Sequence, residues 1–550
     1  MRKLVLALCT SLICLSSQAQ AATHVETPTR PKLVIGIVVD QMRWDYLYRY
    51  YNLYSENGFK RLLNDGFSCE NTLLNYIPTV TAAGHTCIYT GSVPSIHGIA
   101  GNNFMIERTG KHLYCTDDSL SNSVGTDSKA GKMSPRNMLV STVTDELRLA
   151  TNFRSKTIGI ALKDRGAILP AGHTANAAYW FDDKTGGFIT STYYMKELPA
   201  WVQSFNAQDE AARMLNQDWT PLLPLAAYTQ STADDTRYET PFIKGEAPTL
   251  PVKTSELYKK QGYKVIRNTP YGNTLTLEMA KAALDHEHLG KGDFTDFLAV
   301  SLSSTDYVGH QFGINAIEIE DTYLRLDKDL ADFLTYLDTQ VGKGGYSLFL
   351  TADHAAAHNV RFMEDNRLPA GAWRYDKTQT SLDSLINVKF GLTEVVRGMD
   401  NYQVHLDRTK IENAGADYGK LKETLIRFLE SQQGIAYAID MEKAATAPVP
   451  TPIRERIING YNRERSGAIQ VIMQPGWYDV ASNQETTGTT HGVWHPYDSH
   501  IPLLFYGWGI AQGKTTKEVY MTDIAPTLAA LLKIQMPNGC IGKPITEITK

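Results

Sequence analysis

Near its amino terminus the chain carries a continuous apolar run, LVIGIVV (Leu33–Val39), which ends directly at Asp40. A run that is apolar at every position, rather than at every second one, is typical of a strand buried on both faces of a sheet. Comparable short runs rich in β-branched residues recur at 157–162, 297–302, 347–350, Ile469–Met473 and 501–506. We predict strands at all of these positions.

Segments with a helical apolar period separate these runs, at 58–64, 138–150, 274–284, Ile317–Leu337 and 523–532. Strands that alternate with helices favour an α/β fold, in which helices cover both faces of a parallel or mixed sheet. Two long stretches, about 175–268 and about 360–465, break this alternation. Because connections of such length are unusual, we expect them to form cap insertions over one edge of the sheet.

The first residues have the pattern of a cleavable signal peptide. A basic start (residues 1–3) precedes a largely apolar stretch (residues 4–15), and Ala-Gln-Ala at 19–21 fits the small-residue cleavage rule. The apolar stretch is too short to span a bilayer, which favours a removable signal over an anchor. We therefore predict a signal peptide at 1–21, a mature chain of 22–550 without a membrane anchor, and a periplasmic or secreted location.

Charge and cysteine content exclude several kinds of partner and site. The chain has a formal net charge of −5 at pH 7 and no basic cluster, so we expect no nucleic acid as a specific partner. Four cysteines lie beyond the predicted signal peptide: Cys69, Cys87, Cys115 and Cys540. None forms a CxxC pair, which argues against cysteine-ligated zinc, and four cysteines allow three disulfide pairings that the sequence leaves open.

Residues that can bind metals follow three of the predicted strands, and a polar loop ahead of the last strand adds another. These residues are Asp40, Asp306, His310, Asp353, His354 and His491. A single aspartate at a strand end is most often a cap or turn residue. However, ligands of an open α/β sheet bind beyond the carboxyl ends of its strands, so the repeated pattern indicates one shared site. Three carboxylates and three imidazoles suit two metal ions, an arrangement used for in-line phosphoryl displacement.

The order of these residues resembles the alkaline phosphatase superfamily. The resemblance extends to PTVTAAGH at 78–85, YTGSVPSIHGI at 89–99 and TDIAPTL at 522–528. It is strongest for the threonine-nucleophile, phosphate-irrepressible phosphatases and is shared with type I phosphodiesterase/nucleotide pyrophosphatase relatives. Because these motifs span nearly the whole mature chain, the resemblance implies a three-layer α/β/α sandwich with cap insertions, in which 22–550 is one catalytic domain.

The same resemblance implies two zinc ions per chain and a nucleophile. The first ion would be held by Asp306, His310 and His491, and the second by Asp40, Asp353, His354 and, exchangeably, Thr81. A threonine hydroxyl is a poor nucleophile at neutral pH, and a bound metal lowers its pKa. Thr81 would therefore attack phosphorus and carry a phosphothreonine intermediate. Thr79 competes for this role, but the family pattern places the nucleophile two residues later.

Three further residues favour phosphate monoesters as substrates. A monoester dianion has three charged non-bridging oxygens, which cations and amides stabilise. Lys163 and Arg165 follow a predicted strand; such a pair is usually a solvated turn, but here it resembles the Lys-x-Arg pair of the threonine monoesterases. Asn102 resembles their phosphate-binding amide. We therefore expect a monomeric alkaline phosphatase that scavenges phosphate from small-molecule monoesters with broad specificity.

Other functions and other ligands remain as alternatives. A nucleotide pyrophosphatase/phosphodiesterase would use the same metals and Thr81, a phosphonate hydrolase would share the scaffold, and a catalytically silent binding protein would retain only the fold. Six further histidines near the motifs are expected to be structural or supporting donors rather than metal ligands: His85, His97, His173, His358, His495 and His500.

Overall fold

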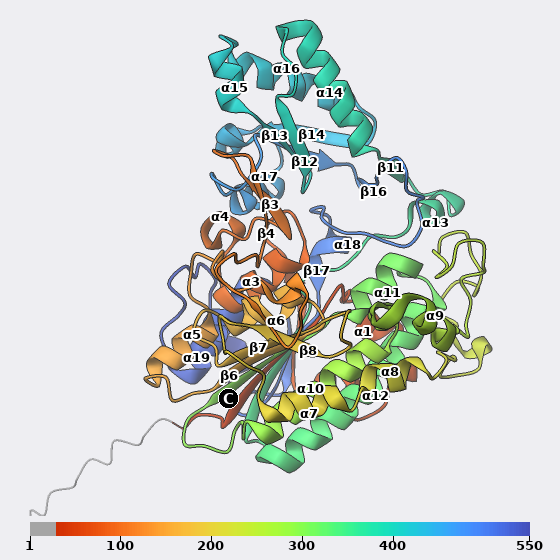
Figure 1. Ribbon diagram of the computed structural model, residues 1–550, viewed down its shortest axis with the longest axis vertical. Helices are drawn as coiled ribbons and strands as arrows, with labels where there is room; N and C mark the ends of the chain where they lie inside the picture. The colour runs from red at the N-terminus through yellow and green to blue at the C-terminus, as the bar shows by residue number, and fades with distance from the viewer. Residues whose placement is uncertain (1–28, 550) are drawn as a thin grey trace, which may run out of the picture. The chain divides into compact units, whose positions relative to one another are not determined.

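A mixed sheet of eleven strands forms the centre of the protein, as the computed structural model of residues 29–549 shows (Figure 1). Its middle strand is β1 (Leu33–Val39), which pairs in parallel with β9 (Asp296–Leu302) on one side and β10 (Tyr346–Thr351) on the other. All three strands are buried at every position. Continuous apolar character therefore marks the strands that helices cover on both faces.

The remaining strands extend this sheet in both directions. Beyond β9 lie β6 (Thr157–Ala161), β7 (Ala177–Phe181), β8 (Phe188–Ser191) and β5 (Ser123–Val124). Beyond β10 lie β18 (Leu503–Gly507), β2 (Phe67–Leu73), β17 (His500–Ile501) and β19 (Gly513–Tyr520). The strands from β10 to β7 run parallel, whereas β18 and β8 run antiparallel to their neighbours.

Two layers of helices enclose the sheet, so the predicted three-layer α/β/α fold is confirmed. One layer contains α7 (Ala200–Ala207), α8 (Glu210–Leu215), α10 (Tyr271–His286) and α12 (Ile317–Leu337). The other contains α3 (Thr81–Thr90), α5 (Val143–Ala150), α6 (Asp164–Ala171) and α19 (Ile524–Leu532). Both layers pack on one large apolar core that includes the central strands.

A smaller sheet forms a separate sub-domain with its own apolar core. Its strands, in spatial order, are β12 (Val396–Asp400), β13 (Gln403–Leu406), β15 (Ile469–Met473) and β14 (Ile435–Asp440). The helices α14 (Tyr375–Phe390), α15 (Arg408–Asn413) and α16 (Tyr418–Glu430) belong to it. We call residues 375–473 the four-stranded sub-domain. The predicted strand Ile469–Met473 therefore exists, but it lies in this smaller sheet and beyond the range expected for the second insertion.

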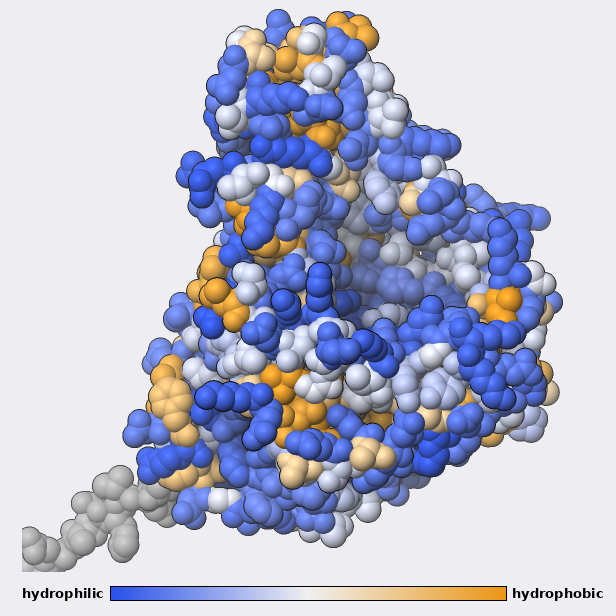
Figure 2. Space-filling view, in the orientation of Figure 1, coloured by the Kyte–Doolittle hydropathy of each residue, from blue (hydrophilic) through white to orange (hydrophobic). Residues whose placement is uncertain are grey.

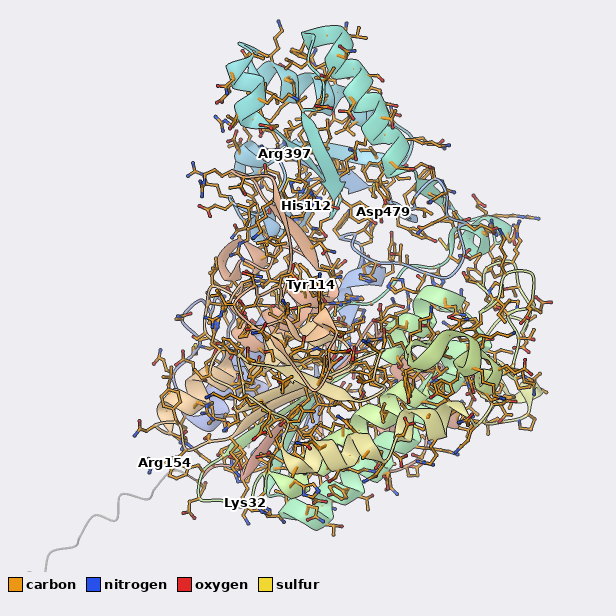
Figure 3. The ribbon with its side chains drawn as sticks, viewed as in Figure 1. Lys32, His112, Tyr114, Arg154, Arg397 and Asp479 are labelled. Atoms are coloured by element: carbon orange, nitrogen blue, oxygen red, sulfur yellow. The ribbon has the colours of Figure 1, made fainter. Side chains whose placement is uncertain are left out.

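A short hairpin lies between the two sheets. It consists of β3 (Asn103–Ile106) and β4 (Lys111–Tyr114) and carries His112 and Tyr114, which lie between the central sheet and the four-stranded sub-domain (Figure 3). The surface has a hollow below this sub-domain (Figure 2). The helices α9 (Thr254–Gln261) and α11 (Ser304–Phe312) lie on the other side of this hollow. The carboxyl ends of the central strands face the same region.

Two expected segments differ from the structure. The helix predicted at 138–150 begins only at Val143, because Thr142 and Asp145 form a capping box that fixes its first turn. The stretch 175–268, expected to be a cap, supplies β7 and β8 to the edge of the central sheet itself. Apolar periodicity did not distinguish the capped helix from the turn that precedes it, nor an edge strand from an insertion.

The predicted signal peptide at 1–21 lies outside the described residues. Within residues 29–549, no helix has the length and apolar character needed to cross a bilayer. In the same part of the chain, Cys69, Cys87, Cys115 and Cys540 are all free thiols. A chain of this size can bury a large core without a disulfide.

Two buried glutamates approach each other where α12 begins. Glu239 is 4% exposed and Glu318 is fully buried. Thr236 donates a hydrogen bond to Oε1 of Glu239 at 2.9 Å, whereas Oε2 of Glu239 and both carboxylate oxygens of Glu318 have no hydrogen-bond partner among the described residues. Burial raises the pKa of Glu239 from 4.5 to about 8, and burial together with the charge of Glu239 raises the pKa of Glu318.

We predict that Glu239→Gln stabilises the protein at high pH. In the folded state Glu239 keeps its proton up to about pH 8, while in the unfolded chain it ionises near 4.5. The stability contributed by this group is full below pH 4.5 and is lost as the pH rises through about 8. Glutamine is neutral in both states, so Glu239→Gln should raise the melting temperature at pH 9 much more than at pH 5. Glu246→Gln, at an exposed site of the same segment, is the matched control; equal effects of Glu239→Gln at both pH values would contradict the prediction.

Candidate two-metal site

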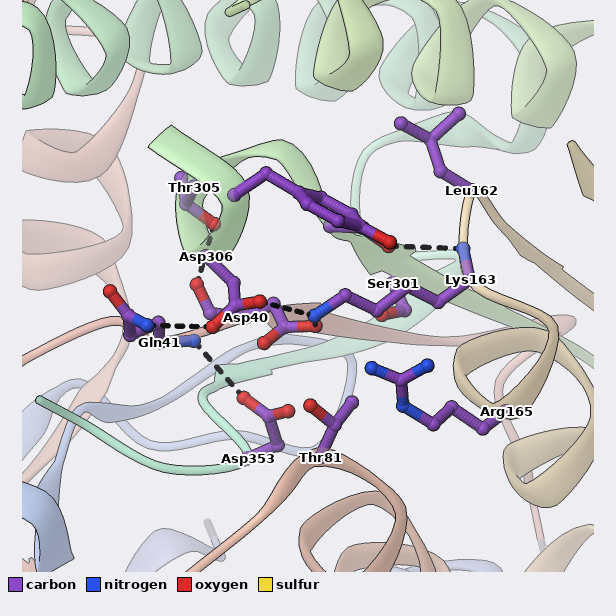
Figure 4. Close-up of polar contacts among 12 residues, drawn as sticks. Asp40, Gln41, Thr81, Leu162, Lys163, Arg165, Ser301, Thr305, Asp306 and Asp353 are labelled. Carbon is purple, nitrogen blue, oxygen red and sulfur yellow. Dashed lines mark hydrogen bonds and ion pairs between the residues drawn. The ribbon is translucent and has the colours of Figure 1, made fainter. Parts of the chain in front are cut away.

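Three aspartates meet where three neighbouring parallel strands end. Asp40 follows β1, Asp306 lies in the first turn of α11 after β9, and Asp353 follows β10. Gln41 ties two of them together, since its Nε2 donates to Asp306 Oδ1 at 2.6 Å and its backbone N–H donates to Asp353 Oδ1 at 3.1 Å (Figure 4). The sheet order β10–β1–β9 thus places the three carboxylates in one cluster.

The three histidines of the site are oriented by the protein backbone. Their Nδ1 atoms lie within hydrogen-bonding distance of carbonyl oxygens: His310 with Thr489 at 2.8 Å, His354 with Ala355 at 3.0 Å and His491 with Thr79 at 2.7 Å. An Nδ1–H that donates to a carbonyl leaves the Nε2 lone pair free for a metal. Burial lowers the pKa values of His354 and His491, which keeps both imidazoles in the neutral form that a ligand needs.

Asp40, Asp353 and His354 form the first metal group. Their ligand atoms all lie within 4.8 Å of one another. His354 Nε2 is 3.6 Å from Asp40 Oδ1 and 3.5 Å from Asp353 Oδ2, and both of these buried oxygens accept no hydrogen bond within residues 29–549. Burial and the charge of Asp353 raise the pKa of Asp40. Buried carboxylate oxygens without partners fit a bound cation, which would offset their desolvation.

Asp306 is the centre of the second metal group. His310 Nε2 lies 3.1 Å and His491 Nε2 3.7 Å from its Oδ1. The three residues whose ligand atoms all approach within 4.8 Å are Asp306, His354 and His491, so His354 lies close to both groups and its ring stacks on that of His491 at 3.5 Å between centroids. All six expected ligands therefore meet in one place, and the division of the histidines between two ions stays a prediction.

Thr81 and Thr79 have different surroundings. Thr81 is the first residue of α3, is 1% exposed, and its hydroxyl oxygen lies 3.5 Å from His354 Nε2. The hydroxyl of Thr79 instead donates to the carbonyl of Val493 at 2.9 Å and accepts from the N–H of Gly492 at 3.0 Å. Thr81 thus faces the first metal group from the amino end of a helix, where anions are favoured, while Thr79 holds the loop that carries His491.

Lys163 lies between the two metal groups. Its ammonium binds Asp40 Oδ2 at 2.7 Å and Asp306 Oδ2 at 2.6 Å, and its side chain is 1% exposed (Figure 4). Burial favours the neutral amine, but the two carboxylates outweigh it and raise the pKa of Lys163. The ring of Tyr307 covers the ammonium at 4.9 Å, which adds a cation–π contact. Lys163 therefore stays charged at the centre of the site.

The side chains of Asn102 and Arg165 are each held by one hydrogen bond and keep other N–H donors that can bind a ligand. Asn102 accepts a hydrogen bond from the N–H of Ala82 through Oδ1 at 2.9 Å, which fixes its amide group at the amino end of α3. Arg165 donates from Nη1 to the hydroxyl of Tyr114 at 3.0 Å, and its buried Nε has no partner in the described part of the chain. A buried guanidinium N–H without an acceptor fits an anionic ligand.

Sequence reasoning missed three residues that support the site, Gln41, Tyr114 and Tyr307, whereas it expected His85 to be a structural or supporting donor. Gln41 and Tyr307 adjoin predicted ligands and could have been suspected from position alone. His85 binds the carbonyl of Thr81 at 2.9 Å and Ser301 Oγ at 2.8 Å, and it belongs to neither metal group. Tyr114 reaches Arg165 only through the fold, and no signal in the sequence links the two.

A cavity of about 790 Å³ opens beside the two metal groups. Lys163, Arg165 and His310 line it on the side of the site, and Phe242 and Tyr307 provide aromatic walls. This volume is large enough for a small organic molecule. The cavity therefore offers space for a ligand next to the two metal groups.

Comparison with known proteins identifies the relatives of this chain. Residues 34–498 match the family described as type I phosphodiesterase / nucleotide pyrophosphatase. The chain is 55% identical to a Myroides odoratus protein named calcium-transporting ATPase, covering 98% of each chain. It is 53% identical to alkaline phosphatase PhoV of Synechococcus elongatus, covering 97% of this chain and 96% of that one. The crystal structure of wild-type alkaline phosphatase PafA matches with a TM-score of 0.93 at 50% identity, covering 95% of this chain and all of the other.

We predict that the protein binds two divalent metal ions per chain and that Asp353→Asn lowers this number toward one. Loss of one charge in the first group removes part of the attraction that offsets burial of the site. Metal content measured by mass spectrometry after dialysis, together with the melting temperature with and without a chelator, tests this. The chelator should lower the melting temperature of the unmodified protein. The control variant Asp293→Asn, at an exposed site, should have the metal content and the chelator response of the unmodified protein. Full metal content in Asp353→Asn would contradict the assignment.

Proposed function

Because the chain belongs to the type I phosphodiesterase / nucleotide pyrophosphatase family and is an alkaline phosphatase, a phosphomonoesterase, we propose that it hydrolyses phosphate monoesters at two zinc ions through a phosphothreonine on Thr81. The observation that carries this proposal is the position of Thr81. Its buried hydroxyl lies at the amino end of α3, 3.5 Å from a histidine of the first metal group, while Thr79 is engaged elsewhere.

The donor set supports zinc as the metal. Aspartate oxygens and histidine nitrogens are ordinary zinc ligands, and the buried carboxylate oxygens without partners are where cations fit. When bound, two such ions would supply Lewis acidity and positive charge to the phosphoryl group and its ester oxygens. The residues proposed to hold them are Asp40, Thr81, Asp306, His310, Asp353, His354 and His491.

The protein's own groups would carry out two successive displacements at phosphorus. The Thr81 hydroxyl oxygen bonds to phosphorus as the bond to the leaving alcohol breaks, which gives a phosphothreonine and the free alcohol. Water then bonds to phosphorus as the bond to the Thr81 oxygen breaks, which releases inorganic phosphate and restores Thr81. Each in-line displacement inverts the configuration at phosphorus, so two of them retain it.

Asn102, Lys163 and Arg165 support a preference for monoesters. The amide of Asn102, the ammonium of Lys163 and the guanidinium of Arg165 offer donors for three charged non-bridging oxygens, which only a monoester has. In a diester one of these oxygens carries a second organic group. Such a group would leave one donor in this buried site without an acceptor, and that costs free energy.

The wider role in the cell is part of the same proposal. The signal-peptide pattern at 1–21 supports export to the periplasm or the medium. There, residues 22–550 would act as a monomeric, single catalytic domain that scavenges phosphate from small-molecule monoesters.

Thr81→Ala should reduce monoester turnover by at least about 10³-fold, because it removes the only atom proposed to form the covalent intermediate. Its metal content should stay close to that of the unmodified protein, since the aspartates and histidines remain. Thr79→Ser keeps a hydroxyl that can make both loop contacts and serves as the control with retained turnover. Steady-state assays with an aryl phosphate and metal analysis check both variants; normal turnover in Thr81→Ala would place the nucleophile elsewhere.

Arg165→Ala and Lys163→Ala should separate monoester from diester hydrolysis. Loss of a donor aimed at a charged phosphoryl oxygen should lower kcat/KM for an aryl monoester by about 10²–10³-fold. The matching diester, which lacks one of these charges, should lose less than about tenfold. Lys260→Ala changes an exposed lysine of α9 and should leave both substrates unaffected. Equal losses on both substrates would favour the alternative of a nucleotide pyrophosphatase/phosphodiesterase.

A further inference from the structure

One hairpin supports two of the proposed phosphoryl-binding residues. Asn102 immediately precedes β3, and Asn103, the first residue of β3, pairs with Tyr114, the last residue of β4. Tyr114 accepts the hydrogen bond from Arg165 at 3.0 Å, and the N–H of the neighbouring Cys115 donates to the carbonyl of Asn102 at 2.9 Å. Any shift of this hairpin therefore moves Asn102 and the partner of Arg165 together.

The four-stranded sub-domain binds the outer part of this hairpin. Arg397 donates from Nη1 to the carbonyl of Glu107 at 2.6 Å, and the buried His405 pairs through Nδ1 with the Glu107 carboxylate at 2.5 Å. Asp400 lies 3.7 Å from the ring of His112. Figure 3 shows His112 and Arg397 where the hairpin meets the sub-domain, with Tyr114 nearer to the central sheet. The sub-domain is thus anchored along the hairpin rather than resting on it at one point.

The turn between β12 and β13 lies against the residues on either side of Asn102. The Asn401 amide donates from Nδ2 to the carbonyl of Asn103 at 2.8 Å. It also covers the backbone just before Asn102, because a Cβ at Gly101 would lie 2.5 Å from Asn401 Nδ2. The side chain of Asn401 therefore contacts the chain on both sides of Asn102.

This turn has a conformation that its sequence does not favour. Asn401 and Tyr402 have φ values of 56° and 59°, and while asparagine tolerates this region, tyrosine does so at a cost. Tyr402 is fixed there by its hydroxyl, which pairs with the Asp479 carboxylate and accepts the Asp479 N–H at 3.2 Å. Its ring packs against Gly492, next to His491. Strain that the surroundings enforce in this way is characteristic of residues that serve a functional site.

We propose that Asn401, at the tip of the four-stranded sub-domain, is a positioning residue for Asn102 and thereby for the phosphoryl group. Asn102 is held from inside by the N–H of Ala82 and from the hairpin by Cys115, and Asn401 completes its support from outside. The inference rests on the proposed function only in taking Asn102 as a ligand of the phosphoryl group. The four-stranded sub-domain would then contribute to catalysis, because one of its residues sets the geometry of the site without touching substrate.

Two substitutions at Asn401 test its hydrogen bond to the Asn103 carbonyl separately from the backbone conformation of the turn. Asn401→Gly keeps a residue suited to positive φ but removes the amide, and Asn401→Asp keeps the size of the side chain but cannot donate to the Asn103 carbonyl. In metal-loaded protein, both should weaken binding of inorganic phosphate, measured by calorimetry, by about 3- to 10-fold. Metal content and melting temperature should change little. Asn413→Gly, an exposed asparagine of the same sub-domain, should bind phosphate normally.

A double-mutant cycle with Asn102→Ala tests whether Asn401 acts through Asn102. If it does, Asn401→Asp should add less than about twofold to the loss of phosphate affinity already caused by Asn102→Ala. Normal phosphate binding in both Asn401 variants, or losses that add in full, would overturn the positioning role. If Asn102→Ala itself binds phosphate normally, the phosphoryl-binding role of Asn102 is overturned together with this inference, and the metals and Thr81 are unaffected by that result.

Discussion

Repulsion among three buried carboxylates is the constraint on which the site depends. Asp40, Asp306 and Asp353 meet because β1, β9 and β10 are adjacent and parallel, so their carboxyl ends open at one edge of the sheet. Charges this close and this deeply buried are tolerated only beside positive charge. Lys163 supplies one cation, and the remaining oxygens without partners are where divalent ions fit. This negative cluster, which would destabilise the fold on its own, is therefore a candidate site for divalent metal ions.

Rigidity around these carboxylates comes from backbone groups drawn from distant parts of the chain. Each imidazole is fixed through Nδ1 to a carbonyl oxygen, and Gln41 bridges two of the aspartates. The supporting atoms belong to loop and turn residues that are themselves buried: Gln41, Thr79, Ala355 and Thr489. Because these residues are packed in place, the ligands need little rearrangement when a cation binds. Asn401 extends this support to a residue proposed to contact the phosphoryl group, from a sub-domain that shares no sheet with the metal site.

Local patterns in the sequence were sufficient to predict the structure of a segment that depends mainly on its own residues. The run Leu33–Val39 became the central strand without change, and Asp40 indicated the site because it ends that strand. The same reasoning predicted the strand Ile469–Met473 but not that it belongs to the smaller sheet, because apolar character reports burial but not which core a strand joins. Tyr114 and Asn401 could not be foreseen at all, since their roles depend on contacts between segments far apart in the sequence.

The measurement that tests the central claim most directly is to trap the covalent intermediate. Metal-loaded protein would be mixed with a phosphate monoester, quenched in acid within the first turnover, digested and mapped by mass spectrometry. The two-metal account predicts a phosphoryl group on the peptide that begins α3, located on Thr81. A phosphoryl group on Thr79, or turnover with inversion at phosphorus and no phosphopeptide, would contradict it.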